Sequence, residues 1–109
     1  MERELKHIFS VNNRTQVFAV GEVDPVTNAC YRYEIRATDD LFNKNPTIIE
    51  LKNTNTVKEP KGCFTEDLLA IVDDILSNYQ ESRFNCVEND NALRHIKEAR
   101  LWLYYDRVS

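Results

Sequence analysis

Short runs of β-forming residues, separated by turn residues, occupy the first half of the chain. The four runs span residues 5–11, 16–20, 30–36 and 46–51. In the third run, aromatic and aliphatic side chains alternate with charged ones from Tyr31 to Arg36, as expected for a strand with one buried face. Turn residues follow the first two runs, at Asn12 and Asn13 and over residues 24–28. The pattern predicts an antiparallel meander with one apolar face.

From residue 65 onward the apolar period changes to steps of three and four residues, which indicates helices. The apolar positions of the first helix are Leu68, Ile71, Val72, Ile75, Leu76 and Tyr79. Thr65 is expected to be its N-cap, while Asn89 or Asp90 is expected to cap a second helix whose apolar stripe runs from Ala92 to Leu103. With a loop near Glu81–Glu88, the two helices predict an αα-hairpin.

The two halves are separated by a polar connector over residues 52–64, which contains Pro60 and Gly62. With 109 residues the chain fits a single domain. We therefore predict an α+β fold in which an N-terminal antiparallel β-sheet (1–51) is followed by the connector and by a C-terminal αα-hairpin (65–107).

Apolar surface spreads almost all round the second helix near its end, over Leu101–Tyr105. A helix that buries one face only does not show this pattern. Packing against the sheet on one side and the first helix on the other is one explanation. A subunit interface, where Trp and Tyr are enriched, is the other, and both can hold.

Charge and composition exclude several classes of protein. The net charge is −4 and no run is rich in Lys or Arg, which disfavours binding to long nucleic acids. No apolar run is long enough for a membrane span, and the first residues, MERELKHIF, lack the apolar core of a secretory signal. The three widely spaced cysteines, Cys30, Cys63 and Cys86, predict neither a disulfide framework nor a metal site, and fit an intracellular protein.

Catalytic and cofactor motifs are absent from the sequence, so we expect a binding protein rather than an enzyme, without a cofactor or a metal. The richest binding chemistry lies in the turn between the helices. The aromatic rings of Tyr79 and Phe84 can stack on a purine, and the amides of Gln80 and Asn89 can read base or ribose edges. The start of the second helix offers backbone N–H groups to a phosphate. The simpler alternative is that both rings only plug the turn and that Asn89 is only an N-cap.

Three motifs in this half carry a resemblance to a known family. They are residues 62–72, with the sequence GCFTEDLLAIV, residues 79–93, and Glu98-Ala99 followed by Trp102-Leu103. In this order and spacing they resemble the phage Thoeris anti-defence sponges, whose helical hairpin is shared with the cyclic-nucleotide sponges that block CBASS immunity. The β-rich first half is similar to the Thoeris type rather than to the all-helical CBASS type.

The resemblance implies a function: sequestration of cyclic ADP-ribose isomers, the signals made by TIR-domain proteins, in the host cytoplasm and without degrading them. It implies a homodimer or a higher homo-oligomer, and ligand contacts from Tyr79 and Asn89. Arg83 or Arg107 is the candidate partner of the pyrophosphate, because two N–H groups of a guanidinium can donate to two phosphate oxygens at once. The chain's last residues, from Tyr104 onward, depart from the tail of such relatives.

Two other functions stay open from the sequence. One is a sponge for cyclic oligonucleotides that acts against CBASS. The other is a protein–protein adaptor that inserts the surface at Leu101–Tyr105 into a host target.

Overall fold

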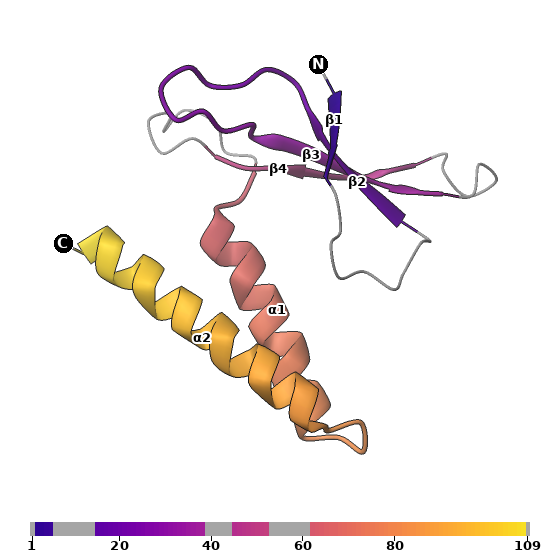
Figure 1. Ribbon diagram of the computed structural model, residues 1–109, viewed down its shortest axis with the longest axis vertical. Helices are drawn as coiled ribbons and strands as arrows, with labels where there is room; N and C mark the ends of the chain where they lie inside the picture. The colour runs from indigo at the N-terminus through magenta and orange to yellow at the C-terminus, as the bar shows by residue number, and fades with distance from the viewer. Residues whose placement is uncertain (1, 6–14, 39–44, 53–61, 109) are drawn as a thin grey trace. The chain divides into compact units, whose positions relative to one another are not determined.

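The computed structural model describes residues 2–5, 15–38, 45–52 and 62–108. Its elements follow one another as four strands and then two helices, which confirms the α+β class and the order predicted from the sequence (Figure 1). The chain divides into two compact units, residues 1–63 and 64–109, and each is described here by itself. The prediction that the two parts form a single domain stays a prediction.

The strands form one antiparallel meander in the order β1-β2-β3-β4 (Figure 1). Their bounds are β1 Glu2–Leu5, β2 Thr15–Val20, β3 Arg32–Ala37 and β4 Thr47–Glu50. The register places Ala19 opposite Tyr33, and Tyr33 opposite Ile49. Because side chains alternate along each strand, these three share one face of the sheet, as the sequence pattern predicts.

The opposite face of the sheet carries most of its charge. There the Arg36 guanidinium lies 4.0 Å from the centre of the Phe18 ring. It also pairs with Glu2 at 2.6 Å and with Glu34 at 3.1 Å. Hydrogen bonds to these carboxylates, first of all to Glu2, raise the pKa of Arg36. This arrangement ties three neighbouring strands together across their polar face.

The first predicted strand overlaps the described residues only at Leu5. A strand was expected at residues 5–11, whereas β1 ends at Leu5. Residues 6–14, with the expected turn at Asn12 and Asn13, lie outside the described residues. The turn predicted at residues 24–28 is confirmed: the Asp24 carboxylate accepts a hydrogen bond from the Val26 N–H at 2.7 Å, and Asn28 has a φ of 62°. An Asx turn of this kind is local, so the sequence reports it directly.

The far end of the connector returns to the sheet. Cys63 donates its N–H to Glu50 at 2.9 Å and accepts one from Lys52 at 2.8 Å. Gly62, just before it, has a φ of +102°, and a Cβ there would stand 2.8 Å from the Glu50 carbonyl oxygen. The end of the predicted connector, residues 52–64, is therefore not a free linker, because Cys63 is hydrogen-bonded to the end of β4.

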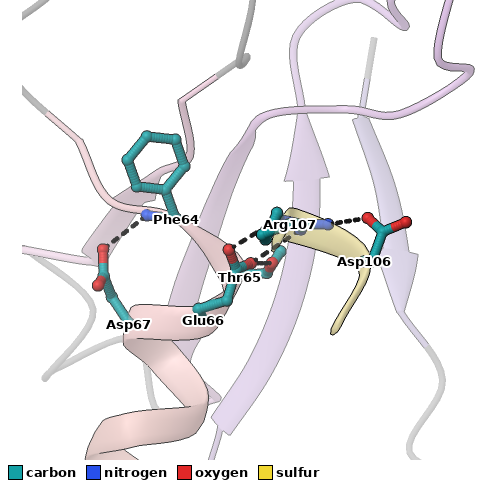
Figure 2. Close-up of polar contacts among 6 residues, drawn as sticks. All are labelled: Phe64, Thr65, Glu66, Asp67, Asp106 and Arg107. Carbon is teal, nitrogen blue, oxygen red and sulfur yellow. Dashed lines mark hydrogen bonds and ion pairs between the residues drawn. The ribbon is translucent and has the colours of Figure 1, made fainter. Parts of the chain in front are cut away.

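The first helix, α1, spans Thr65–Gln80. Its N-cap is Phe64 and not Thr65, because Thr65 already has helical geometry. Phe64 has no side-chain acceptor, so the cap works in the other direction: its N–H donates to the Asp67 carboxylate at 2.8 Å (Figure 2). The prediction of a Thr65 cap was wrong because an acidic residue at the third helical position replaces it.

The second helix, α2, spans Val87–Val108, so it begins before both residues expected to cap it. Asn89 and Asp90 already lie in its first turn. Cys86 precedes the helix instead, with its carbonyl accepting the Asp90 N–H at 3.1 Å and its sulfur accepting the Asn89 N–H at 3.4 Å. This correction frees the Asn89 side chain from the capping role. Neither α1 nor α2 combines the length and the apolar character needed to cross a membrane.

The two helices pack side by side through one face each. The half-buried apolar side chains of the two helices are Leu68, Leu69, Ala70, Leu76, Leu93, Ile96, Ala99 and Leu103. A second apolar set remains exposed: Ile71, Val72, Ile75, Tyr79, Leu101, Trp102, Tyr104 and Tyr105. The expected apolar stripe of α1 thus divides into an inner part and an outer part that its own hairpin does not cover.

An ion cluster joins the helices near the middle of α1. The Asp73 carboxylate is 6% exposed and is the one buried charged group among the described residues. It pairs with Lys97 at 3.0 Å and with Arg100 at 2.5 Å, both on α2, and accepts a hydrogen bond from Ser77 at 3.0 Å. Lys97 first, and then Arg100, lower the pKa of Asp73 from 3.8 to about 2.

Replacing Gly62 with alanine should destabilise the protein more than replacing Gly21 does. Both residues have a positive φ, which costs a side-chain-bearing residue about 1–3 kcal/mol. Only at Gly62 would the new Cβ also collide with a backbone oxygen, whereas nothing lies within 4 Å at Gly21. Urea denaturation followed by circular dichroism measures the two losses. Equal losses would contradict the close approach at Gly62.

The Asp73 cluster should make stability depend on pH in acid. Its pKa is lower in the folded protein than in the unfolded chain, so its contribution is complete above pH 4 to 5 and is lost as the pH falls towards about 2. We expect the melting temperature of Asp73→Asn to be below that of the wild type at pH 6, with the difference shrinking towards pH 2. Asp74→Asn, on the exposed side of the same helix, is the control. A difference that stays constant with pH would count against the cluster.

Candidate functional site

The site lies where the hairpin reverses direction, in the loop 81–86 between α1 and α2. Two side-chain hydrogen bonds close this loop. The amide of Gln80 donates from Nε2 to the Cys86 carbonyl at 3.0 Å, and its Oε1 accepts the Cys86 N–H at 3.1 Å. The last residue of α1 is therefore held directly against the residue that precedes α2.

Further hydrogen bonds fix the loop from inside. The Ser82 hydroxyl donates to the Tyr79 carbonyl at 2.7 Å and accepts the Phe84 N–H at 3.0 Å. The Asn85 amide donates to the Ser82 carbonyl at 2.9 Å. Small polar residues favour such local bonds in turns, which is the sequence signal for them, yet neither Ser82 nor Asn85 was expected to contribute.

Tyr79, Phe84 and Asn89 line one hollow of about 420 Å³ beside this loop. The size lies within the range of small-molecule pockets, about 300–1,000 Å³. Both rings are well exposed, Tyr79 at 48% and Phe84 at 64%, so neither is used up by packing inside the turn. The structure therefore brings together three of the six residues selected from the sequence, and leaves their rings accessible.

Two polar groups that line this hollow can hydrogen-bond to a ligand. Neither the Tyr79 hydroxyl nor the Asn89 amide hydrogen-bonds to any residue in the described part of the chain. The first turn of α2 adds the positive end of a helix dipole, but Glu88 and Asp90 stand in the same turn and oppose an anion there. A phosphate at this site consequently needs a cation from elsewhere.

Arg83 is the cation nearest in sequence to the hollow. Its guanidinium carbon lies 4.9 Å from the centre of the Phe84 ring, in cation–π contact with one of the two rings. The loop thus carries a positive charge beside the aromatic lining.

Arg107 lies at the other end of the hairpin. It pairs with Glu66 in the first turn of α1 at 3.1 Å, and with its neighbour Asp106 (Figure 2). The Thr65 hydroxyl first, and then Arg107, lower the pKa of Glu66. At about 1.5 Å per residue, α1 separates this end from the loop by roughly 20 Å. Within one hairpin, Arg107 does not reach the hollow.

Gln80 has a different position from the one its amide suggests. Its Nε2 donates to the Cys86 carbonyl and its Oε1 accepts the Cys86 N–H, so these two bonds orient the amide towards the loop backbone. The sequence shows an amide beside two rings but does not show that the amide is already paired. The structure shows the hydrogen bonds of Gln80 to Cys86. A contact of Gln80 with a ligand stays a prediction.

A second hollow, of about 360 Å³, lies farther along the helices and is lined by Asp73, Lys97, Arg100 and Leu101. Its charged groups pair with one another, as described above. No three His, Cys, Asp or Glu side chains gather into a metal site anywhere in the described ranges. The hollow at the turn is therefore the better candidate, because its polar groups are unpaired.

Comparison with known proteins identifies a relative. No protein-family model matches the sequence. The chain is 45% identical to Thoeris anti-defense 1 of Bacillus phage SBSphiJ7, over an alignment of 123 residues that covers 93% of this chain and 87% of the relative. At that coverage the similarity extends through both compact units and includes more than the hairpin.

Proposed function

This chain belongs to the Thoeris anti-defense 1 family, and we propose that it counters Thoeris immunity by binding a cyclic ADP-ribose isomer, the signal made by TIR-domain proteins. The protein holds the signal away from its effector and does not degrade it. It acts in the host cytoplasm, where the signal is produced.

The observation that carries this proposal is the shared hollow of Tyr79, Phe84 and Asn89. An adenine ring has two faces for stacking, and two exposed aromatic side chains at one hollow suit it, at about 1–3 kcal/mol for each stacked base. The free Asn89 amide has both a donor and an acceptor for a base or ribose edge. A flat ring and a polar edge are the two features that an adenosine moiety presents.

Arg83 supports the phosphate half of the ligand. Cyclic ADP-ribose carries a pyrophosphate, and a guanidinium matches its oxygens in a bidentate arrangement. Arg83 stands beside the Phe84 ring, whereas Arg107 is engaged with Glu66. We therefore assign the pyrophosphate to Arg83 within one hairpin, and to Arg107 only from a second copy of the chain.

The protein must bind tightly and in stoichiometric amounts, since a sponge removes one signal molecule for each site. The experiment mixes an excess of protein with the product of a TIR-domain enzyme, removes the unbound fraction, heats the complex, and identifies the released molecule by mass spectrometry. We expect the signal to return intact. A cleaved product would show turnover and would contradict the sponge mechanism. A cyclic dinucleotide run in parallel tests the CBASS alternative.

Asn89→Ala should weaken binding by roughly tenfold to a hundredfold, because one polar contact to the ligand is lost. The matched control is Asn91→Ala, two residues farther along α2 and thus on another side of the helix. Circular dichroism should show the same helix content for both variants. Unchanged calorimetric affinity in Asn89→Ala would refute this placement of the ligand.

We propose that the protein works as a homodimer or a larger homo-oligomer. The hairpin leaves apolar side chains exposed, and Trp102 is 65% exposed. Tyr105 packs edge-on against Trp102, with 6.1 Å between the centres of the two rings. Exposed apolar side chains that cluster on a soluble protein often mark an interaction surface. The same aromatic surface is the observation in favour of the second candidate function, an adaptor that binds a host protein.

Measurement of the mass in solution separates these two uses of the surface. We expect light scattering to give a dimer or a multiple of it, and Trp102→Lys to shift the protein towards the monomer. Asn91→Lys, which adds the same charge to an exposed polar position of α2, is the control. A wild-type monomer with an exposed patch would favour the adaptor.

A further inference from the structure

We infer that Gln80 and Ser82 are positioning residues for the site at the turn, an inference that rests on the proposed function. Together they form a latch, defined here as the four hydrogen bonds that these two side chains make across the loop 81–86. Neither is required to touch the ligand. Their role is to hold the ligand-binding side chains in place before the ligand arrives.

The Gln80 half of the latch sets the distance between the helices at the turn. Its amide pairs with both the N–H and the carbonyl of Cys86, as a peptide group would in a sheet. Tyr79 precedes Gln80 by one residue, and Asn89 follows Cys86 by one helical turn. Fixing Gln80 against Cys86 therefore fixes the separation of the ring and the amide that line the hollow.

The Ser82 half of the latch joins the two rings. One hydroxyl bridges the backbone of Tyr79, at 2.7 Å, and the backbone of Phe84, at 3.0 Å. Ser82 is half-buried, and water is a poorer substitute for its partners there than at an exposed position. Losing the hydroxyl releases the Phe84 backbone from the end of α1 while the ring itself stays intact.

Preorganisation explains why such a latch matters for affinity. Ordering a loop backbone and the side chains on it has a conformational entropy cost. If the loop is already ordered, a ligand meets the rings in their final arrangement and keeps its full binding free energy. If the loop is open, part of that free energy goes into closing it. The latch therefore affects affinity without contributing a ligand contact.

The test compares Gln80→Met, which keeps the side-chain length and the helix propensity but removes both hydrogen bonds, with Asn78→Ala as control. Asn78 ends the same helix, and its amide contacts Asp74 within α1. We expect Gln80→Met to weaken binding of the cyclic ADP-ribose isomer by about tenfold, with helix content and melting temperature close to those of the control. Ser82→Ala should weaken it similarly, and Ser82→Thr, which keeps a hydroxyl, should restore it.

Amide hydrogen exchange gives the readout that a ligand contact would not move. In the ligand-free protein, the Cys86 N–H should exchange slowly in the wild type and at least tenfold faster in Gln80→Met. Wild-type affinity in Gln80→Met, or equal exchange in the two proteins, would overturn the inference. If the wild type binds no cyclic ADP-ribose isomer, the proposed function fails separately, and the Cys86 exchange rates still decide whether the latch exists.

Discussion

Two helices joined by a short loop can bury only one face of each against the other, and this constraint determines the rest of the C-terminal half. The inner faces of α1 and α2 meet through leucines and Ile96, with Asp73 placed among them and neutralised by Lys97 and Arg100. A buried carboxylate with two cations is a weak source of stability, but it tolerates only arrangements in which both partners reach it. The cluster therefore specifies how the helices face each other more than it strengthens their packing.

The outer faces follow from the same constraint. Ile71, Ile75 and Trp102 remain exposed, although large apolar residues of these types are usually buried. In the described part of the chain, only Ala19, Val20 and Cys30 are buried apolar residues, all in the sheet unit. Association with another surface would bury the exposed apolar side chains, which is the physical basis for proposing an oligomer. The open side of the ligand hollow would then face a second surface instead of solvent.

How far the sequence predicts this structure depends on the range of each interaction. Periodicity reports which residues share a face, so the meander, the two helices and the loop between them were all predictable. It does not report how far each apolar position is covered, so Ile71 and Leu76 looked equivalent although Ile71 is exposed and Leu76 is half-buried. Both helix starts were misplaced because backbone groups have other hydrogen-bond partners than expected. The Phe64 N–H donates to the Asp67 carboxylate, and the Cys86 carbonyl accepts the Asp90 N–H.

In the candidate site too, the sequence predicts local arrangements but not contacts between distant residues. Tyr79, Phe84 and Asn89 lie close together because they are at the end of α1, in the short loop and in the first turn of α2. This proximity can be predicted from the sequence. The roles of Gln80 and Arg107 depend on contacts that cross the loop or the whole hairpin, with Cys86 and Glu66 respectively. No pattern of residue types distinguishes a free amide from a paired one, or a cation at the ligand from one at a helix start.

Charge placement argues for a small, shaped ligand over a polymer. The chain has a net charge of −4, and the first turn of α2 adds two carboxylates beside the hollow. A long polyanion meets this field over its whole length and is repelled by it, since its binding depends on many phosphates being neutralised together. A ligand of the size of cyclic ADP-ribose would meet only the few groups at the turn, where Arg83 supplies one cation and where stacking does not depend on net charge. This charge placement is the physical argument for proposing a compact phosphate ester with flat rings, and not a polymer, as the ligand.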